Sequence, residues 1–537
     1  MPGDERLVAL QRVGCDQPLL PDPHDVRLPD GPLDRAILRR DPDGSLTDIG
    51  ELPTLVPKGE RVRVQIRPVA EARFSLDCDV AIVGAGAAGH VATLAASEQG
   101  ASVIAFERDR VPSGSTGLSS GLVPAAGTRL QRDAGVVDSA GALARDIQRK
   151  ARHQADDAVV RSLAESIGPT IDWLMDRHGI PFVLVDGFAY PGHGARRMHG
   201  PPLRTGQQLM DHLVRAAAEA GVDVVTQAAV QVLYHDGERI RGVRIERPDG
   251  SGEDIGCRAL VLCCCGYGGN RALVERYMPA AASAVFLGHA GNEGHAVIWG
   301  EQLGAELADM TAFQGHGSVA VPHNIGITWA IMMSGGIQVN ALGERFANEH
   351  RGYSEQALDV LRQPGAIAFD VYDRRCHEVA VGFDHYRHAV AAGAIRIADG
   401  IASLEAQCAL PSGSLARTLA AVAAYRAGAE DPLGRDFTSL PPLEPPYHAI
   451  KVTGGLYHTQ GGLAVDPVGR VKRARGGCFP NLFAAGGAAR GVSGPADWGY
   501  LAGNGLLSAL ALGRLAGVAA AREAMGVAAP PEAPRWA

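Results

Sequence analysis

The sequence predicts an α/β fold in which buried parallel strands alternate with helices. Three observations predict it. A strand, a glycine-rich turn, a helix and a second strand follow one another between Cys78 and Glu107. Further apolar runs end in glycine clusters, at residues 259–270 and 481–487. Apolar residues are 46% and charged residues 20% of the chain, which is typical of a globular protein with a large core.

The stretch from Cys78 to Glu107 reads CDVAIVGAGAAGHVATLAASEQGASVIAFE. The apolar runs at residues 79–83 and 102–106 are short enough for buried parallel strands, and residues 87–99 have helical character between them. This order of elements gives the glycines in the turn a defined place at the start of a helix.

Gly84, Gly86 and Gly89 have the spacing G-x-G-x-x-G. In this arrangement the first glycine permits a tight turn, the second lets the backbone approach a pyrophosphate, and the third lets the helix pack closely on the strand. Glu107 ends the second strand, where it can accept hydrogen bonds from ribose hydroxyls. The unit therefore predicts dinucleotide binding. A glycine-rich turn in some other α/β protein would have no evident use for Glu107.

Composition excludes several classes of protein. The net charge of -8, without a Lys/Arg run, argues against general nucleic-acid affinity. The start, MPGDERLV, has charge where a signal peptide needs an apolar core, and no stretch reaches the ~18 uninterrupted apolar residues of a membrane span. Cys263, Cys264 and Cys265 fit a buried strand with reduced thiols better than a metal site. We expect a soluble, cytoplasmic protein with no metal.

The remaining elements follow in order. An edge strand is expected at 61–66, helical periodicity at 140–178, a helix at 206–220, a strand at 222–226, a hairpin at 230–246, buried strands at 259–264 and 481–485, and a helix from about 505. The predicted domains are an N-terminal extension of unknown role at 1–76, a nucleotide-binding domain at 77–306 and 443–522, an inserted domain at 307–442, and a tail at 523–537.

Two loops carry polar residues that could meet a ligand. Residues 112–127 read PSGSTGLSSGLVPAAG, and their small side chains allow the backbone to lie close to a flat ring or a phosphate. The alternative is that this segment is a flexible linker. Residues 188–200, FAYPGHGARRMHG, could line an anionic or carbonyl-bearing pocket or could form a solvated surface loop. Both interpretations of the second loop stay open.

Taken together, these motifs resemble the fumarate reductase and succinate dehydrogenase flavoprotein family, which includes the 3-ketosteroid dehydrogenases. The matching pieces, in the family's order, are DVAIVGAGAAG, GSTGLSSG, VLCCCGYGG, GGIQVNALGERFANE, HTQGG, NLFAAGG and GYLAGNGLLSALALGRLAG. The resemblance implies a Rossmann-type FAD-binding domain with an inserted α+β capping domain that closes over the substrate.

The resemblance also implies which residues contact FAD. They are Gly84, Gly86, Ala87, Ala88, Gly89, Glu107, Arg108, Ser115, Thr116, Ser120, Gly121, Val230, Gly266, Gly487, Asn504, Gly505 and Leu506. Gly487 stands where relatives often carry Glu. No histidine occupies the position of covalent flavin attachment in some relatives, so the FAD is expected to be non-covalent.

For catalysis, the resemblance points to five residues. His316 follows a DM-x-x-x-Q stretch and His458 begins HTQGG, and both are expected to contact the substrate. Arg351 or Tyr353, which follow GERFANE, is expected to carry the proton. Tyr500, in GYLAGN, resembles a tyrosine that polarises the carbonyl or moves a proton in the ring-ketone dehydrogenases.

The last glycine loop departs from the fumarate-type pattern. Those members use an arginine there to grip a carboxylate, whereas this chain has PADWGYLAGN, and Arg490 lies at a different position. The departure argues against a C4 dicarboxylate substrate.

The leading hypothesis is an FAD-dependent oxidoreductase that reduces or introduces a C=C bond next to a carbonyl or carboxylate of a small-molecule substrate. Since the chain has a single dinucleotide fingerprint, its electron donor or acceptor should be external. One alternative is an FAD oxidase or dehydrogenase acting on C–N or C–OH bonds. Another is a flavin-binding electron-transfer subunit. A pure nicotinamide dehydrogenase would leave the last glycine loop without a ligand.

Overall fold

The structure is a computed structural model that describes residues 36–40, 46–51, 64–185 and 190–527. It divides into two units, Met1–Thr54 and Leu55–Ala537. The first contains an antiparallel pair, β1 (Ala36–Arg40) and β2 (Leu46–Glu51). Most of the predicted extension and residues 528–537 of the predicted tail lie outside the described residues.

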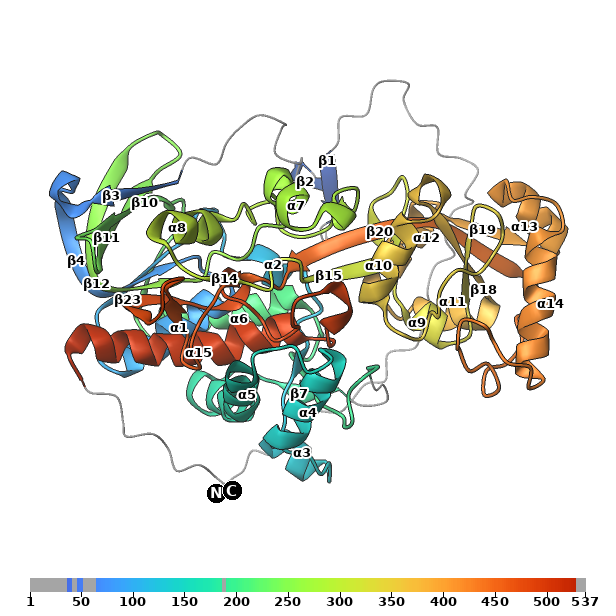
Figure 1. The fold of residues 1–537 in the computed structure, drawn as a ribbon, viewed down its shortest axis with the longest axis horizontal. Helices are drawn as coiled ribbons and strands as arrows, with labels where there is room; N and C mark the ends of the chain where they lie inside the picture. The colour runs from blue at the N-terminus through green and yellow to red at the C-terminus, as the bar shows by residue number, and fades with distance from the viewer. Residues whose placement is uncertain (1–35, 41–45, 52–63, 186–189, 528–537) are drawn as a thin grey trace, which may run out of the picture. The chain divides into compact units, whose positions relative to one another are not determined.

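A nine-stranded sheet forms the core of the second unit, with β3-β10-β11-β12-β4-β5-β9 in spatial order; β23 also pairs with β12, and β22 pairs with β23. The bounds are β3 (Gln65–Pro68), β4 (Phe74–Val83), β5 (Val103–Phe106), β9 (Asp223–Val225), β10 (Ala229–His235), β11 (Ile240–Glu246), β12 (Gly252–Leu262), β22 (Arg470–Lys472) and β23 (Cys478–Ala484). The pairs β12–β4, β4–β5, β5–β9 and β12–β23 are parallel, whereas β10, β11 and β12 form an antiparallel meander. The predicted α/β fold is confirmed (Figure 1).

The central strands end at different residues from those predicted. β4 begins at Phe74 because its first residues also pair with β12. β12 ends at Leu262, so Cys263, Cys264 and Cys265 follow the strand, and the prediction that it extends to residue 264 is wrong. Cys265 has a φ of 63°, which no β-strand residue adopts. The chain thus turns away from the sheet at the carboxyl ends of its parallel strands.

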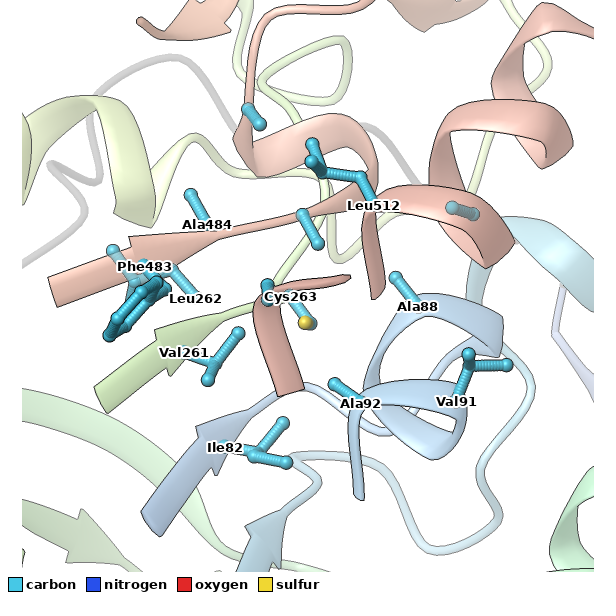
Figure 2. Packing of buried hydrophobic residues seen from close by; sticks show 14 of the residues in the cluster. Ile82, Ala88, Val91, Ala92, Val261, Leu262, Cys263, Phe483, Ala484 and Leu512 are labelled. Atoms are coloured by element: carbon cyan, nitrogen blue, oxygen red, sulfur yellow. The ribbon is translucent and has the colours of Figure 1, made fainter. Parts of the chain in front are cut away.

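Two helices pack side by side against one face of this sheet, α1 (Ala87–Glu98) and α15 (Asn504–Met525). Figure 2 shows Ala88 and Ala92 of α1 and Leu512 of α15 to the right of the buried strand residues. A Cβ at Gly513 would lie 2.7 Å from the carbonyl oxygen of Ala88, and one at Gly517 would lie 2.3 Å from that of Ala92. Glycine in α15 therefore permits the close packing. Among the described helices, α15 alone could cross a membrane by length and composition, and 61% of its apolar window is buried in the fold.

The other helices of the core surround these layers. They are α2 (Gly114–Gly117), α3 (Arg129–Asp133), α4 (Ala140–Lys150), α5 (Asp157–His178), α6 (Gly206–Glu219), α7 (Arg271–Tyr277) and α8 (His295–Leu303). The helical periodicity at 140–178 belongs to two helices, because Asp156 caps the start of α5 through the backbone N–H groups of Ala158 and Val159. Short strands complete this region: β6 (Val123–Pro124), β7 (Val183–Leu184), β8 (Met198–Gly200), β14 (Leu307–Ala308) and β21 (Gly462–Leu463).

A second, largely antiparallel sheet has the order β16-β15-β20-β18-β17, with β13 and β19 also paired to β20. Its strands are β13 (Val285–Phe286), β15 (Phe313–Ala320), β16 (Ile325–Gly326), β17 (Ile337–Asn340), β18 (Ala368–Asp373), β19 (Ile395–Ala398) and β20 (Tyr447–Thr459). Its helices are α9 (Ala330–Met333), α10 (Tyr353–Leu361), α11 (Arg374–Ala380), α12 (Asp384–Ala391), α13 (Ile401–Cys408) and α14 (Ser414–Arg426). β20 is the central strand, although it follows the predicted boundary at residue 442. The domain boundaries stay predictions.

Short 3-10 helices connect several of these elements. They are η1 (Val69–Glu71), η2 (Pro279–Ala281), η3 (Pro364–Ala366), η4 (Gly486–Ala488) and η5 (Asp497–Gly499).

Candidate functional site

A cavity of about 430 Å³ opens at the carboxyl ends of β4, β5 and β12 and continues to the second sheet. Its size is that of a ligand-binding pocket, and its place at the strand ends is where α/β sheets bind ligands. Turns of glycine and other small residues line one end of the cavity, and aromatic and imidazole side chains line the other. The two ends have different chemistry.

The glycine turn forms the wall of the first end. Gly84 has a φ of +95°, and a Cβ there would lie 2.6 Å from the carbonyl oxygen of Cys263. A Cβ at Gly89 would lie 1.9 Å from the carbonyl oxygen of Gly84, so Gly89 packs the helix on the strand and does not line the cavity. A Cβ at Gly86 would meet nothing closer than Thr116 Oγ1 at 3.9 Å. The space in front of Gly86 is therefore available to a ligand.

The N-termini of two helices, α1 and α15, lie at this end. α1 begins after Gly86 and α15 after Gly503, so neither has a capping side chain at its N-cap, and neither has an acidic residue in its first turn, although Ala87 N of α1 donates to Thr116 Oγ1. Ala87, Gly505 and Leu506, at these N-termini, line the cavity. The partial positive charge of both helices favours an anionic or electron-rich group there.

Glu107 is fixed at the end of β5 by two backbone donors. Ala85 N donates to Oε2 at 2.9 Å and Asp109 N donates to Oε1 at 3.0 Å. A carboxylate oxygen can accept more than one hydrogen bond, so both remain able to bind ribose hydroxyls. Arg108 also lines the cavity, where its guanidinium pairs with Glu293 at 3.0 Å.

The small-residue loop lies along the same wall. Ser115, Thr116 and Ser120 line the cavity. Ser115 Oγ accepts from Asn292 Nδ2 at 3.0 Å, and Thr116 Oγ1 accepts from Ala87 N at 3.3 Å. The loop is therefore held to the helix N-terminus, and the alternative of a flexible linker does not describe it.

The other predicted FAD residues divide into two groups. Ala88, Val230 and Gly487 line the cavity. Gly121, Gly266 and Asn504 do not line it. Gly121 has a φ of +65° and packs against the backbone of Thr205. Gly266 packs against Thr459, because a Cβ there would lie 2.0 Å from Thr459 Oγ1. Asn504 is fully buried, with its Oδ1 unpartnered within the described structure.

These features fit FAD. The cradle formed by Gly84, Gly86 and the first turns of α1 and α15 has an open face at Gly86, two helix N-termini and, at Glu107, a fixed carboxylate. Together these suit a pyrophosphate, a ribose and a polar ring edge. FAD is the cofactor that the cavity accommodates. Among the described residues, no group of three or more His, Cys, Asp or Glu side chains could hold a metal ion.

Four of the five predicted catalytic residues meet at the other end of the cavity. The rings of His316 on β15 and Tyr353 on α10 stack with centroids 5.2 Å apart. Tyr500 lies with its ring centroid 6.4 Å from that of Tyr353 and 5.7 Å from that of His458 on β20. All four line the cavity. The pairing of β15 with β20 brings the two histidine strands together.

Both histidines are neutral near pH 7. Burial lowers the pKa of His316 to about 4 and that of His458 to about 4. Ser318 N donates to Nδ1 of His316 at 3.1 Å, so the ring proton is on Nε2. Burial also raises the pKa of Tyr353 and of Tyr500, which keeps both phenols protonated. The cluster is thus a set of neutral hydrogen-bond donors.

Arg351, the fifth predicted residue, does not join the cluster. Its side chain is half exposed and pairs with Asp359, and it does not line the main cavity. Gly352, with a φ of +139°, turns the chain between Arg351 and Tyr353 and so directs the two side chains differently. Of the two predicted proton carriers, the structure places only Tyr353 in the cavity.

The open question about the loop at 188–200 is answered in part. Residues 186–189 lie outside the described structure, whereas Tyr190 and Met198 line the cavity. Arg197 is buried and binds Asp138 and Asp146, and His199 Nε2 lies 2.8 Å from Thr128 Oγ1. This loop therefore contributes one wall of the cavity and a buried ion-pair cluster behind it.

Sequence reasoning missed several aromatic residues of the cavity. The rings of Trp329 and Tyr457 lie with centroids 5.9 and 5.7 Å from that of His316. Tyr457 directly precedes His458, and strict strand alternation would put them on opposite faces. The register of β15 and β20 shifts at this point, and both residues reach the cavity. No periodicity in the sequence indicates that shift.

Comparisons with known proteins agree with this architecture. A model of a family described as an FAD binding domain matches residues 79–506. The chain is 29% identical over 453 residues to a probable fumarate reductase of Shewanella frigidimarina, which covers 83% of this chain and 75% of that protein.

Two solved structures show the same fold. One is an open conformation of a flavocytochrome c3 fumarate reductase, with a TM-score of 0.73, 28% identity and coverage of 85% of this chain and 80% of that chain. The other is a 3-ketosteroid-Δ4-(5α)-dehydrogenase from Rhodococcus jostii RHA1 in complex with 4-androstene-3,17-dione, with a TM-score of 0.70, 25% identity and coverage of 85% and 100%. The resemblance that the sequence motifs predicted is confirmed.

Proposed function

Because the chain belongs to the FAD binding domain family, we propose that it adds or removes hydrogen across a carbon–carbon bond next to the carbonyl group of a neutral, apolar substrate. It is an FAD-dependent oxidoreductase of CH–CH groups. When bound, FAD supplies the acceptor or donor of hydride. The chain's own residues must then bind the carbonyl, exclude water and handle the proton at the adjacent carbon.

The charge of the cavity supports a neutral substrate. Among the described lining residues, Arg108 is the sole arginine or lysine, and it pairs with Asp109 and Glu293 at the end away from the His–Tyr cluster. Arg490, near the last glycine loop, pairs with Asp156 and Asp309 and does not line the cavity. A dicarboxylate would lose its hydration here without gaining a cationic partner.

The shape and composition of the cluster support a ring-shaped or otherwise broad substrate. Trp329, Tyr353, Tyr457 and Tyr500 surround His316 and His458. Aromatic faces bind apolar rings through buried area, and neutral donors between them fix one carbonyl oxygen. The similar structure that holds 4-androstene-3,17-dione binds a compound of this kind.

In this proposal His316, His458 and Tyr500 donate hydrogen bonds to the carbonyl oxygen. Such donors stabilise the negative charge that develops on that oxygen when the α-carbon loses or gains a proton. Near pH 7 each neutral imidazole in this buried cluster has one N–H and the phenol of Tyr500 has its O–H, so all three groups can donate. Burial strengthens each of these bonds by excluding water.

Tyr353 is the proposed proton carrier. It begins α10, lines the cavity and stacks on His316, so its hydroxyl can face the carbon next to the carbonyl. The raised pKa of Tyr353 favours the protonated phenol, which can donate a proton when a C=C bond is reduced. In the opposite direction Tyr353 must first be ionised, and the phenolate then accepts the proton from the α-carbon and becomes the phenol.

The observation that carries this function is the neutral His–Tyr cluster in a cavity end without a cationic side chain among its described residues. It can be tested by mixing the FAD-loaded protein anaerobically with cyclohexanone, a saturated 3-oxosteroid, succinate, an amino acid and a secondary alcohol. We expect loss of the visible flavin absorbance with a ketone. Loss with the amino acid or alcohol alone would favour the alternative C–N or C–OH oxidation, and loss with succinate alone would exclude the neutral substrate.

A further inference from the structure

A chain of buried polar side chains connects His458 to the N-terminus of α15. Gln460 Nε2 lies 2.9 Å from His458 Nδ1, and Ser493 Oγ donates to Gln460 Oε1 at 2.8 Å. Asn504 Nδ2 donates to Ser493 Oγ at 3.5 Å. The exposed fractions of Gln460, Ser493 and Asn504 are 5%, 1% and 0%. Buried polar groups joined in this way hold one another in a single arrangement.

The orientation of the Gln460 amide bears on the tautomer of His458. The amide presents Nε2 to the imidazole and Oε1 to the hydroxyl of Ser493. An amide NH2 group can only donate, so in this orientation Nδ1 accepts and the ring proton is on Nε2. The carbonyl oxygen of Thr459 lies farther from Nδ1, at 3.3 Å, and would need the opposite tautomer. The tautomer proposed below is the one that the shorter contact, from Gln460, requires.

Backbone contacts keep Gln460 in place. Its N–H donates to the carbonyl oxygen of Ala312 at 2.8 Å, and its own carbonyl oxygen accepts from Gly491 N at 2.7 Å. A Cβ at Gly491 would lie 2.9 Å from Gln460 Oε1, so the amide fits against a bare backbone. The backbone of Gln460 is thus held on both sides, and its side-chain amide is held by Ser493.

The other face of the imidazole rests on α15. A Cβ at Gly505 would lie 2.8 Å from His458 Cε1 and 2.9 Å from Nε2. The titratable side chain packed on the ring is Tyr500, whose phenol is neutral because burial raises its pKa. His458 is therefore clamped between Gln460 and the first turn of α15, and its Nε2 lies beside Gly505, which lines the cavity.

We propose that Gln460 is a positioning residue that, with Ser493, holds His458 as a neutral imidazole whose Nε2–H faces the substrate. The inference rests on the proposed function, in which that N–H donates to the substrate carbonyl. It adds a specific requirement, because a histidine with the other tautomer would present a lone pair to the carbonyl oxygen and repel it. The lowered pKa of His458 agrees with a neutral ring.

The tautomer can be measured without any substrate. The FAD-loaded full chain would be labelled with 15N-histidine, and the His458 signals would be assigned by their loss in His458→Asn. We expect the neutral Nε2–H tautomer from pH 5 to pH 9. An Nδ1–H tautomer, or an imidazolium at pH 7, in the unmodified chain would overturn the proposal.

Variants of Gln460 test whether this residue sets the tautomer. Gln460→Glu replaces the donor by a carboxylate that can only accept, so the pKa of His458 should rise and Nδ1 should become protonated. Gln460→Met keeps the volume but removes the bond, and a mixture of tautomers is expected. Gln314 lies opposite His458 in the β15–β20 pair and, in the described structure, makes no hydrogen bond to Nδ1. Gln314→Glu therefore adds the same charge beside His458 without replacing the Gln460 bond, and it should leave the tautomer unchanged. If Gln460→Glu and Gln314→Glu behave alike, the effect is one of charge and the proposal fails.

Kinetics separate this inference from the proposed function. If a ketone bleaches the flavin, Gln460→Met should lower the bleaching rate constant by at least ~10-fold with a smaller change in ketone affinity. If affinity and rate change together, Gln460 has only a structural role and the proposal is wrong. If no ketone bleaches the flavin while the Nε2–H tautomer is observed, the proposed function fails and the positioning of His458 by Gln460 stands.

Discussion

Tyr353 stacks on His316 with the two ring centroids 5.2 Å apart and the ring planes 27° from parallel. Tyr353 begins α10 and His316 lies in β15, and α10 packs against that strand. The contact places a phenol and an imidazole donor side by side at the end of the cavity opposite the glycine cradle. A proton carrier and a carbonyl-binding group are needed at neighbouring atoms of the substrate, so this pair is central to the proposed reaction.

Replacing Tyr353 by Phe should slow reduction of the flavin by a ketone by at least ~100-fold, because the hydroxyl that carries the proton is lost while the stacking ring remains. Rapid-mixing absorbance under anaerobic conditions measures this rate. Arg351→Gln is the matched control, two residues away, and it should keep a rate close to that of the unmodified protein. The opposite ranking of the two variants would return the proton-carrying role to Arg351.

The glycines of the cradle should respond differently to an added methyl group. Gly86→Ala meets open space in the protein, so the stability of the FAD-free chain should be unchanged while FAD binding weakens by at least ~10-fold. Gly84→Ala would be strained at φ +95° and would clash with Cys263, which should lower the free energy of unfolding by ~1–3 kcal/mol or more. Denaturant unfolding of the FAD-free protein and flavin fluorescence titration give the two quantities.

Equal loss of stability in both variants would show that the space in front of Gly86 is not a ligand site.

The free energy of unfolding should fall as the pH is lowered from about 6.5 to about 4. Burial holds the folded-state pKa of His316 at about 4, below the ordinary value, so the unfolded chain binds more protons in this window. Denaturant unfolding at a series of pH values measures the slope. His316→Asn should reduce the slope, to which the buried His458 also contributes, whereas the same change at the exposed His153 should not. An unchanged slope in His316→Asn would mean that this histidine is charged in the fold.

Arg197 should be required for stability and not for chemistry. Its guanidinium is 1% exposed and pairs with Asp138 and Asp146 behind the loop that contains Tyr190. Arg197→Met leaves Asp138 without its cationic partner and Asp146 with only the exposed Arg149, at a cost of ~3–5 kcal/mol. Arg145→Met, on the exposed face of α4 beside Asp146, should change stability by less than ~0.5 kcal/mol. Similar losses in both variants, measured by denaturant unfolding, would contradict the importance of the buried pair.

The sequence predicted the cofactor end of the cavity well because local rules determine it. Glycine spacing sets the turn at Gly84 and the start of α1, which begins at Ala87 as predicted. Glu107 follows from its place at the end of β5. Each of these features depends on neighbours within about one βαβ unit, so spacing alone carries the information.

The substrate end could be predicted only in part because long-range packing determines it. The direction of the Arg351 side chain depends on the positive φ of Gly352. The register shift between β15 and β20 allows both Tyr457 and His458 to reach the cavity.

The end of β12 at Leu262 was also not predictable from the sequence. It reflects a turn at the cavity wall and not a change in residue type, since the cysteines that follow are as apolar as the strand. Sequence periodicity contains no signal for any of these three features.

The rate at which a cyclic enone reoxidises the anaerobically reduced protein, compared with fumarate, tests the central claim most directly. A cavity end lined by neutral His and Tyr donors should accept cyclohex-2-enone or a 4-ene-3-oxosteroid at least ~10-fold faster than fumarate at equal concentration, because burial of two unpaired carboxylates is costly. Reoxidation by fumarate as fast as by the better of these two enones, or faster, would contradict the account.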